Sequence, residues 1–148
     1  MIEPVLDTDL PTLRRITAAA VRESIVKSED EAAFLIADID RGLESWLANP
    51  DDSLHLKYRA DDEIVGYILV REFWNISHLF VLPRCQRRGI GTALLRAAIE
   101  SCRAKSPRKK LQLNSSTNAV PFYTSMGFKQ TGPGLDRPGG RVPFEYCF

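Results

Sequence analysis

The hydrophobic residues of the first fifty positions recur three and four residues apart, which is the spacing of helices that bury one face. One helix is predicted over residues 10–21, with Thr8 or Asp9 as its N-terminal cap. A second is predicted over residues 29–48, because it begins in an acidic cluster and Pro50 ends it.

From residue 53 the pattern changes to the alternation that is typical of strands. Residues 53–60 and 63–71 predict a hairpin around the polar turn Asp61-Asp62. Residues 76–82 are apolar on both faces except at two positions, which indicates a strand in the middle of a sheet.

The second half of the chain predicts a crossover between two parallel strands. A helix over residues 91–105 and a strand over residues 110–115 follow the central strand, and this order implies parallel pairing. The remaining predicted elements are an edge strand at residues 2–6, a short helix at 117–126 closed by Gly127, and a last strand at 141–148. The predicted fold is a single α/β domain over residues 1–148, with a mixed, mostly antiparallel sheet and a central parallel strand–helix–strand crossover.

Composition narrows the possible classes of protein. The chain has 148 residues, 44% of them hydrophobic, which is enough for one core. Twenty Lys and Arg against 19 Asp and Glu give no sign of binding to nucleic acid or a membrane surface. Three scattered cysteines and two isolated histidines argue against a disulfide framework or a metal site. With no signal peptide or apolar segment of membrane-spanning length, we expect a cytoplasmic protein without a metal.

The most informative segment is the turn between the central strand and the crossover helix. A helix start leaves backbone N–H groups unpaired and carries the positive end of the helix dipole, which suits a phosphate or pyrophosphate. Two glycines would let the backbone approach such a ligand, and two arginines add positive charge. By itself the turn also fits an ordinary tight turn with solvated arginines. Its residues are Gln86, Arg87, Arg88, Gly89, Ile90, Gly91 and Thr92.

A second motif further along the chain makes the turn more specific. The segment Asn114-Ser-Ser-Thr-Asn-Ala-Val-Pro-Phe-Tyr-Thr-Ser-Met-Gly-Phe128 follows the predicted parallel strand. Together with the Gln-x-x-Gly-x-Gly turn, it resembles the GCN5-related N-acetyltransferase (GNAT) superfamily. The resemblance covers about residues 53–130 by motif and the first helices by order.

The resemblance implies acetyl-CoA as the acyl donor and suggests which residues hold it. The turn would bind the pyrophosphate through the amides of residues 88–92. The pantetheine arm would lie along the strand segment Leu79, Phe80 and Val81. The backbone of Leu79 and Val81 would hold its amides, and the same backbone could polarise the thioester carbonyl. Further contacts to the arm would come from Asn114, Ser116, Asn118 and Phe122.

The resemblance also implies candidate catalytic residues. Tyr123 matches the tyrosine that protonates the leaving thiolate in the family, and the pKa values of tyrosine and such a thiol, about 10 and about 8.5, allow this transfer. The alternative is that Tyr123 only fills the core. The base stays open among His78, Glu72 at the mouth of the preceding hairpin, and a water that Asn114 could orient.

The function implied is acetyl transfer to a primary amine by direct attack on the thioester. The acceptor, a small molecule or a peptide, is not identified, and a homodimer is an open expectation because dimers are common in the superfamily. Two rivals remain: a non-catalytic acyl-CoA-sensing or protein-binding module of the same fold, and a nucleotide-binding domain. Acidic residues of the first two helices could attract a cationic amine or simply form a solvated face.

Overall fold

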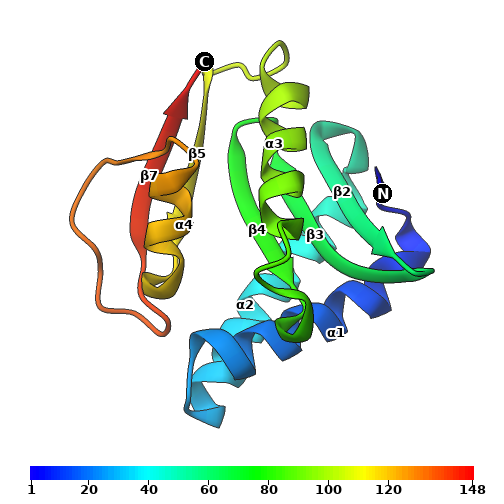
Figure 1. Ribbon diagram of the computed structural model, residues 1–148, viewed down its shortest axis with the longest axis vertical. Coiled ribbons are helices and arrows are strands. Elements are labelled where there is room, and N and C mark those ends of the chain that lie inside the picture. The colour runs from blue at the N-terminus through cyan, green and yellow to red at the C-terminus, as the bar shows by residue number, and fades with distance from the viewer.

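The strands form one seven-stranded sheet in the order β1-β2-β3-β4-β5-β7-β6, seen in the computed structural model of all 148 residues (Figure 1). Every neighbouring pair is antiparallel except β4 and β5, so the predicted fold class is confirmed. The strands are β1 (Ile2–Pro4), β2 (Ser53–Ala60), β3 (Glu63–Arg71), β4 (Asn75–Val81), β5 (Lys110–Ser115), β6 (Lys129–Gln130) and β7 (Val142–Cys147). The helices are α1 (Leu10–Ala20), α2 (Glu29–Ala48), α3 (Ile90–Cys102) and α4 (Val120–Ser125).

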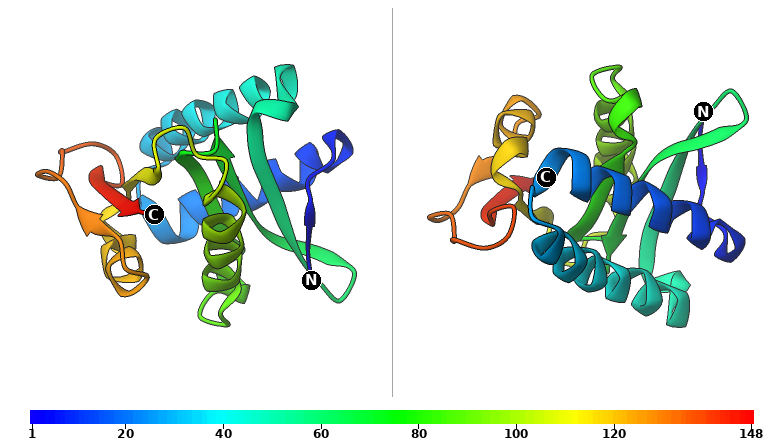
Figure 2. Two further views of the ribbon diagram at one scale, coloured as in Figure 1. Left: turned by 90° about the horizontal axis from the view of Figure 1, so that it is seen from above. Right: turned by 90° about the horizontal axis from the view of Figure 1, so that it is seen from below.

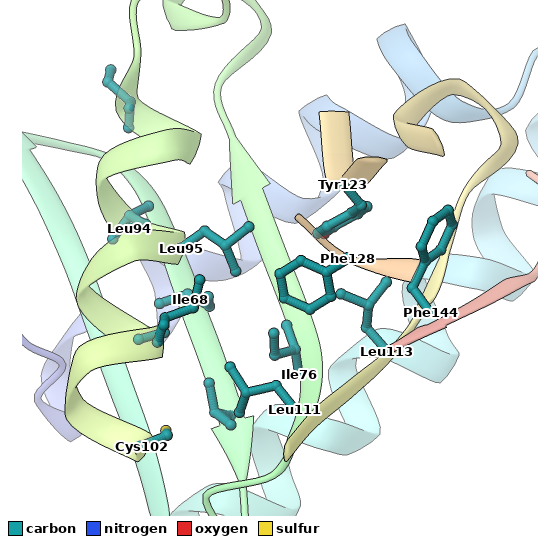
Figure 3. Close-up of a cluster of buried hydrophobic side chains, with 14 of the residues drawn as sticks. Ile68, Ile76, Leu94, Leu95, Cys102, Leu111, Leu113, Tyr123, Phe128 and Phe144 are labelled. Atoms are coloured by element: carbon teal, nitrogen blue, oxygen red, sulfur yellow. The ribbon is translucent and has the colours of Figure 1, made fainter. Parts of the chain in front are cut away.

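Helices cover both faces of this sheet because β3, an inner strand, is apolar on both. All residues of β3 from Ile64 to Val70 are buried. Successive side chains of a strand point to opposite faces, so Ile68 joins the cluster that α3 covers, whereas Tyr67 joins the one that α1 and α2 cover. Figure 2 shows α3 and α4 on one face and α1 and α2 on the other. Figure 3 shows the larger cluster, which continues from α3 to the aromatic side chains near α4.

The two parallel strands part after a short contact. Asn75 pairs with Gln112 and Ile76 with Leu113, and no further pair joins β4 to β5. In contrast, β5 pairs with β7 along its whole length. The remainder of β4 therefore has an unpaired edge on this side, and Figure 1 shows the strands diverging toward the loop that enters α3.

The strand β4 also contains a β-bulge, which the nearly continuous apolar pattern of residues 76–82 did not predict. Leu69 pairs with His78, but the next residue, Val70, pairs with Ile76, so Ser77 is the extra residue of β4. A bulge bends its strand and redirects the side chains beyond it. His78 consequently faces α1 and α2, where it is buried.

The connection between α1 and α2 contains a π-helical turn that the sequence pattern did not predict. α1 continues as one turn of π-helix, Val21–Ile25, closed by a hydrogen bond from the Val26 N–H to the Val21 carbonyl at 3.0 Å. A π-turn inside a helical segment frequently occurs at a functional site. Here it directs Ser24 toward the loop before α3, as described below.

Most predicted elements are confirmed, with boundaries that differ by a few residues. The central strand is Asn75–Val81, and the crossover helix ends at Cys102. Asp9 occupies the predicted N-cap position of α1, but its side chain does not cap the helix, because the carboxylate instead accepts from Lys57 Nζ at 2.6 Å. None of the helices is both long and apolar enough to cross a membrane.

A buried histidine without a hydrogen bond lies beneath α2. His55 on β2 is 6% exposed, and neither of its ring nitrogens has a partner. Its ring packs edge-on against Trp46, with the ring centres 4.4 Å apart. Burial lowers the pKa of His55 to about 3, and burial also lowers the pKa of His78 to about 4.

We predict that these two histidines make the fold sensitive to acid. Their folded pKa values lie below the 6.5 of an unfolded histidine, so between pH 7 and pH 5 only the unfolded chain takes up these protons, and stability falls. Each histidine should cost about 2 kcal/mol of unfolding free energy over this interval. We measure the unfolding free energy in urea at pH 7 and at pH 5. His55→Leu should lose about 2 kcal/mol less stability between these pH values than the wild type, whereas Ser53→Ala in the same strand should lose as much as the wild type. An unchanged loss in His55→Leu would contradict the prediction.

Gly42 on α2 provides the space for the His78 ring. A Cβ at Gly42 would lie 2.5 Å from His78 Nε2, well inside van der Waals contact. The ring is also held from its other side, because Nδ1 is 3.3 Å from the Tyr67 hydroxyl. The glycine is therefore explained by the approach of the imidazole to the helix backbone.

We predict that Gly42→Ala lowers stability, although alanine is normally the better residue inside a helix by about 0.5–1 kcal/mol. The clash should cost about 1–3 kcal/mol in urea denaturation and shift the NMR signals of the His78 ring. Ala33 and Ala37 on the exposed side of α2 provide a control. Ala37→Gly should cost about 1 kcal/mol without moving the His78 signals. A stabilised Gly42→Ala protein would show that His78 is not held there.

Candidate active site

The parted strands open onto a cavity of about 720 Å³. Its walls come from α2, β4, the end of β5 and the segment 137–141 before β7. His78 from β4 and Tyr123 from α4 both line it. The cavity thus brings together two of the three candidate catalytic residues. Of the candidate cofactor residues, Leu79, Phe80, Asn114 and Ser116 also line it.

Beyond the end of β4, the turn before α3 presents a row of free backbone donors. The N–H groups of six consecutive residues, Arg87 to Thr92, make no hydrogen bond within the chain. The first bond of the helix runs from the Ala93 N–H to the Gly89 carbonyl at 3.0 Å. Free amides at the positive end of a helix dipole are suited to binding an anion, and the sequence analysis expects this turn to bind one.

The conformation of the turn explains one of its glycines. Gly89 has a φ of 82°, in the left-handed region that side chains with a Cβ disfavour. A Cβ there would meet no atom within 4 Å, so packing inside the chain does not require glycine. Arg87 also has a positive φ, of 64°. The turn therefore stores some backbone strain at the place where its amides converge.

The free edge of β4 connects this turn to the cavity. The Leu82 N–H donates to the Val65 carbonyl at 2.8 Å, and in an antiparallel pair the direction of the backbone groups alternates. The backbone groups of Leu79 and Val81 therefore point away from β3, toward the opening. The Val81 carbonyl accepts from Gln86 Nε2 at 3.2 Å, which agrees with this direction. The Leu79 amide and carbonyl are free to pair with an extended ligand.

Ser24 on the π-turn joins both sides of the opening. Asn118 Nδ2 donates to the Ser24 carbonyl at 2.6 Å, and Gln86 Nε2 lies 3.5 Å from the Ser24 hydroxyl. Phe122 lies close to the same place, since a Cβ at Gly91 would be 3.7 Å from its ring. Asn118 and Phe122 thus lie near the anion-binding turn rather than deep in the cavity.

Tyr123 sits in an aromatic cluster with only its hydroxyl free. Its ring contacts Phe122, Phe128 and Phe144, at ring-centre distances of 5.1, 5.7 and 6.1 Å. The side chain makes no hydrogen bond within the chain and lines the cavity. Burial raises the pKa of Tyr123, so the hydroxyl keeps its proton at neutral pH. Core packing and the capacity to donate a proton are therefore combined in one residue.

His78 lines the cavity, as expected of a catalytic group, but its pKa differs from the expected value. It ends a chain of hydroxyls, in which the Thr17 Oγ1 and Tyr67 hydroxyl lie 2.6 Å apart. The sequence suggested a pKa suited to proton transfer near neutrality, whereas burial lowers it to about 4. His78 is therefore neutral at pH 7, and it is a weak base.

Glu72 lies apart from the cavity. It occupies the exposed turn between β3 and β4, with a φ of 54°, and its carboxylate accepts from Trp74 Nε1 at 3.2 Å. It lines a separate hollow, together with Trp46 and Asp52. The structure does not bring Glu72 together with His78 and Tyr123, because the turn is at the opposite end of β4 from the anion-binding turn.

The acidic residues of the first two helices are mostly engaged in ion pairs. Arg14 binds Asp40 at 2.7 Å and Glu44 at 2.6 Å, and Arg22 binds Glu29 at 3.0 Å. These pairs support the interpretation of a solvated, salt-bridged face. The residues that sequence reasoning missed are Ser24, the bulge at Ser77, and the arginines of the cavity. Only the arginines carry a sequence signal, their charge, and nothing in the pattern places them together.

Comparisons with known proteins agree with this geometry. A family model described as an acetyltransferase (GNAT) domain matches residues 23–142. An N-alpha-acetyltransferase of Sulfurisphaera tokodaii is 28% identical over 120 residues, which are 69% of this chain and 59% of that protein. The chain thus spans less than two thirds of the length of this relative.

Two solved structures share the fold. A GCN5-related N-acetyltransferase of Rhodopseudomonas palustris has a TM-score of 0.84 at 20% identity, covering 100% of this chain and 95% of its own. The PaiA N-acetyltransferase of Thermoplasma acidophilum, solved in complex with coenzyme A, has a TM-score of 0.81 at 22% identity, covering 100% and 98%. Since the family model covers most of its length and the fold agrees throughout, the chain belongs to the GNAT acetyltransferase family.

Proposed function

We propose that this protein transfers an acetyl group from acetyl-CoA to the amine of an acceptor. The observation that carries the proposal is the continuity of three features: the six free amides of residues 87–92, the free edge of β4, and the cavity that holds Tyr123 and His78. The amides, the edge of β4 and the cavity follow one another in the same order as the pyrophosphate, the pantetheine arm and the thioester of acetyl-CoA. The structure of the PaiA enzyme with coenzyme A supports the same ligand class here.

In this proposal the residues act mainly by positioning and polarisation. The amides before α3 hold the pyrophosphate, and the Leu79 backbone pairs with the amides of the arm. A free N–H of β4 donates to the thioester oxygen as negative charge develops on it. The amine nitrogen bonds to the carbonyl carbon while the carbon–sulfur bond breaks. Tyr123 donates a hydrogen bond and then its proton to the departing thiolate, and the tyrosinate, whose pKa is raised by burial, takes a proton back from solvent at the cavity.

The proton of the amine takes a different route. Because the pKa of His78 is about 4, far below that of an amine, we infer that His78 accepts a hydrogen bond rather than the proton itself. A water held between His78 and Asn114, both of which line the cavity, carries the proton to solvent. Glu72 has no part in this route, since it lies in another hollow.

The direct test measures binding and turnover separately. We expect calorimetry to show binding of acetyl-CoA and no comparable heat with ATP or NAD. Release of free thiol in the presence of an amine panel should then show turnover. Binding without any turnover would favour an acyl-CoA sensor, and preferential binding of ATP or NAD would favour a nucleotide-binding domain.

For the anion-binding turn, we predict that Gly89→Val lowers acetyl-CoA affinity at least about 100-fold, because several charge-assisted hydrogen bonds are lost when valine cannot keep the left-handed φ. Arg87→Gly is the matched control, since glycine tolerates the φ of 64° and only an exposed charge is removed. It should weaken binding about two- to fivefold in calorimetry. Equal effects of both changes would show that charge, not backbone geometry, binds the cofactor.

For the catalytic tyrosine, we predict that Tyr123→Phe lowers kcat by about 100- to 10,000-fold, the usual contribution of a general acid. The acetyl-CoA dissociation constant should stay within about twofold, because phenylalanine keeps the packing that buries the ring. Tyr146→Phe, which removes a hydroxyl from a ring near Phe128 but outside the cavity, is the control. A Tyr123→Phe protein as active as this control would leave Tyr123 with a packing role alone.

A further inference from the structure

We propose that the acceptor carries a carboxylate as well as its amine, and that Arg71 binds this carboxylate. The inference rests on the proposed acetyl transfer and adds the class of acceptor to it. It concerns the part of the cavity farthest from the anion-binding turn.

The charges that line the cavity are unbalanced. Four arginines, Arg41, Arg71, Arg137 and Arg141, face one carboxylate, Asp38. That carboxylate is already paired, because Arg41 Nη2 lies 2.9 Å from Asp38 Oδ1. The only other titratable side chains of the lining are His78, which is neutral at pH 7, and Tyr123, which keeps its proton. The surplus positive charge would repel an ammonium acceptor that carries no anionic group of its own.

Arg71 is the best placed of the three arginines without a partner. It ends β3 and is half-buried, and its Nη2 donates to Ser45 Oγ on α2 at 3.0 Å. That bond fixes the guanidinium and leaves its other N–H groups unused. Asp52 and Glu72 line the neighbouring hollow with Arg71, yet neither carboxylate lies within 4 Å of it. A guanidinium that is held in place and has a pair of unused N–H groups can bind both oxygens of a carboxylate.

Arg71 is too far from the anion-binding turn for one anion to reach both. Arg71 pairs with Asn75 at the start of β4, whereas the turn follows Val81 at its end. Six residues of extended strand span about 20 Å. A carboxylate at Arg71 would instead share the cavity with His78 and Tyr123, which line it as well.

Two sources supply an amine beside a carboxylate. One is a free amino acid, whose α-carboxylate Arg71 would bind. The other is a peptide N-terminus with Asp or Glu in its first residues. The shared chemistry is the pair of amine and carboxylate, and a plain diamine or polyamine lacks it.

The experiment compares acceptors that differ only in the carboxylate. Free thiol release is measured with alanine against alanine amide, and with the amidated peptides Ala-Asp-Ala and Ala-Asn-Ala, with spermidine as the amine without a carboxylate. The acid of at least one pair should exceed its neutral partner in kcat/KM by about 10- to 100-fold, mainly through KM. The pair that shows the difference identifies the source.

Variants connect the preference to Arg71. R71Q should reduce the ratio of acid to neutral acceptor to about threefold or less, while its acetyl-CoA dissociation constant stays within about twofold of wild type. R71K keeps the positive charge but loses the planar fork of the guanidinium, so it should reduce the ratio in part, and it serves if R71Q folds poorly. Arg15 is exposed, has no carboxylate partner and lies outside the cavity, so R15Q should keep the wild-type ratio.

Several outcomes would overturn the inference while leaving the proposed function intact. They are turnover of neutral acceptors or spermidine at least as fast as the acids, and an R71Q protein that keeps the wild-type ratio. Loss of acetyl-CoA affinity in R71Q would show that this arginine serves the cofactor instead, and binding of acetyl-CoA with turnover of no carboxylate-bearing amine would also reject the inference. Absence of acetyl-CoA binding in the wild-type protein would reject the proposed function itself.

Discussion

The site depends on the early separation of β4 from β5. Backbone N–H and C=O groups at a sheet edge need partners, and a buried edge without them is costly. The chain leaves this edge open beyond Ile76, although the same strand is paired along its other side with β3. The separation therefore creates both the cavity and a set of backbone groups that an extended ligand can satisfy.

The rest of the molecule keeps that opening in shape. β3 is buried on both faces, which anchors β4 between α3 and the pair of α1 and α2. Tyr123 and Phe128 belong to the same cluster as Leu94 and Leu95 of α3, so the α4 side of the opening shares a core with the β4 side (Figure 3). Ser24 adds polar contacts across the mouth. Rigid walls reduce the entropy lost when a ligand is bound and oriented.

Much of this arrangement was predictable from the sequence, because it depends on local patterns. Periodicity predicted the order of elements, and the glycines and arginines of residues 86–92 predicted an anion-binding turn. The bulge at Ser77 was not predictable, since one extra residue in a strand leaves the pattern of a doubly buried strand almost unchanged. The pKa of His78 was misjudged for a related reason: sequence does not show how completely a polar residue is buried. Glu72 stays outside the cavity although its neighbour Arg71 lines it, because Glu72 lies in the exposed turn after β3, where its carboxylate accepts from Trp74 Nε1, and sequence nearness does not reveal this direction.

The distribution of charge suggests why the two ends of the site differ. At the turn before α3, the positive field comes from backbone amides and the helix dipole, which can approach a diphosphate closely and do not depend on side-chain conformation. In the cavity, the field comes from side chains on three separate elements, β3, α2 and the segment before β7. Backbone donors suit a ligand that every reaction cycle uses. Side chains suit the recognition of one particular acceptor, because single substitutions can change them without disturbing the backbone of the turn before α3.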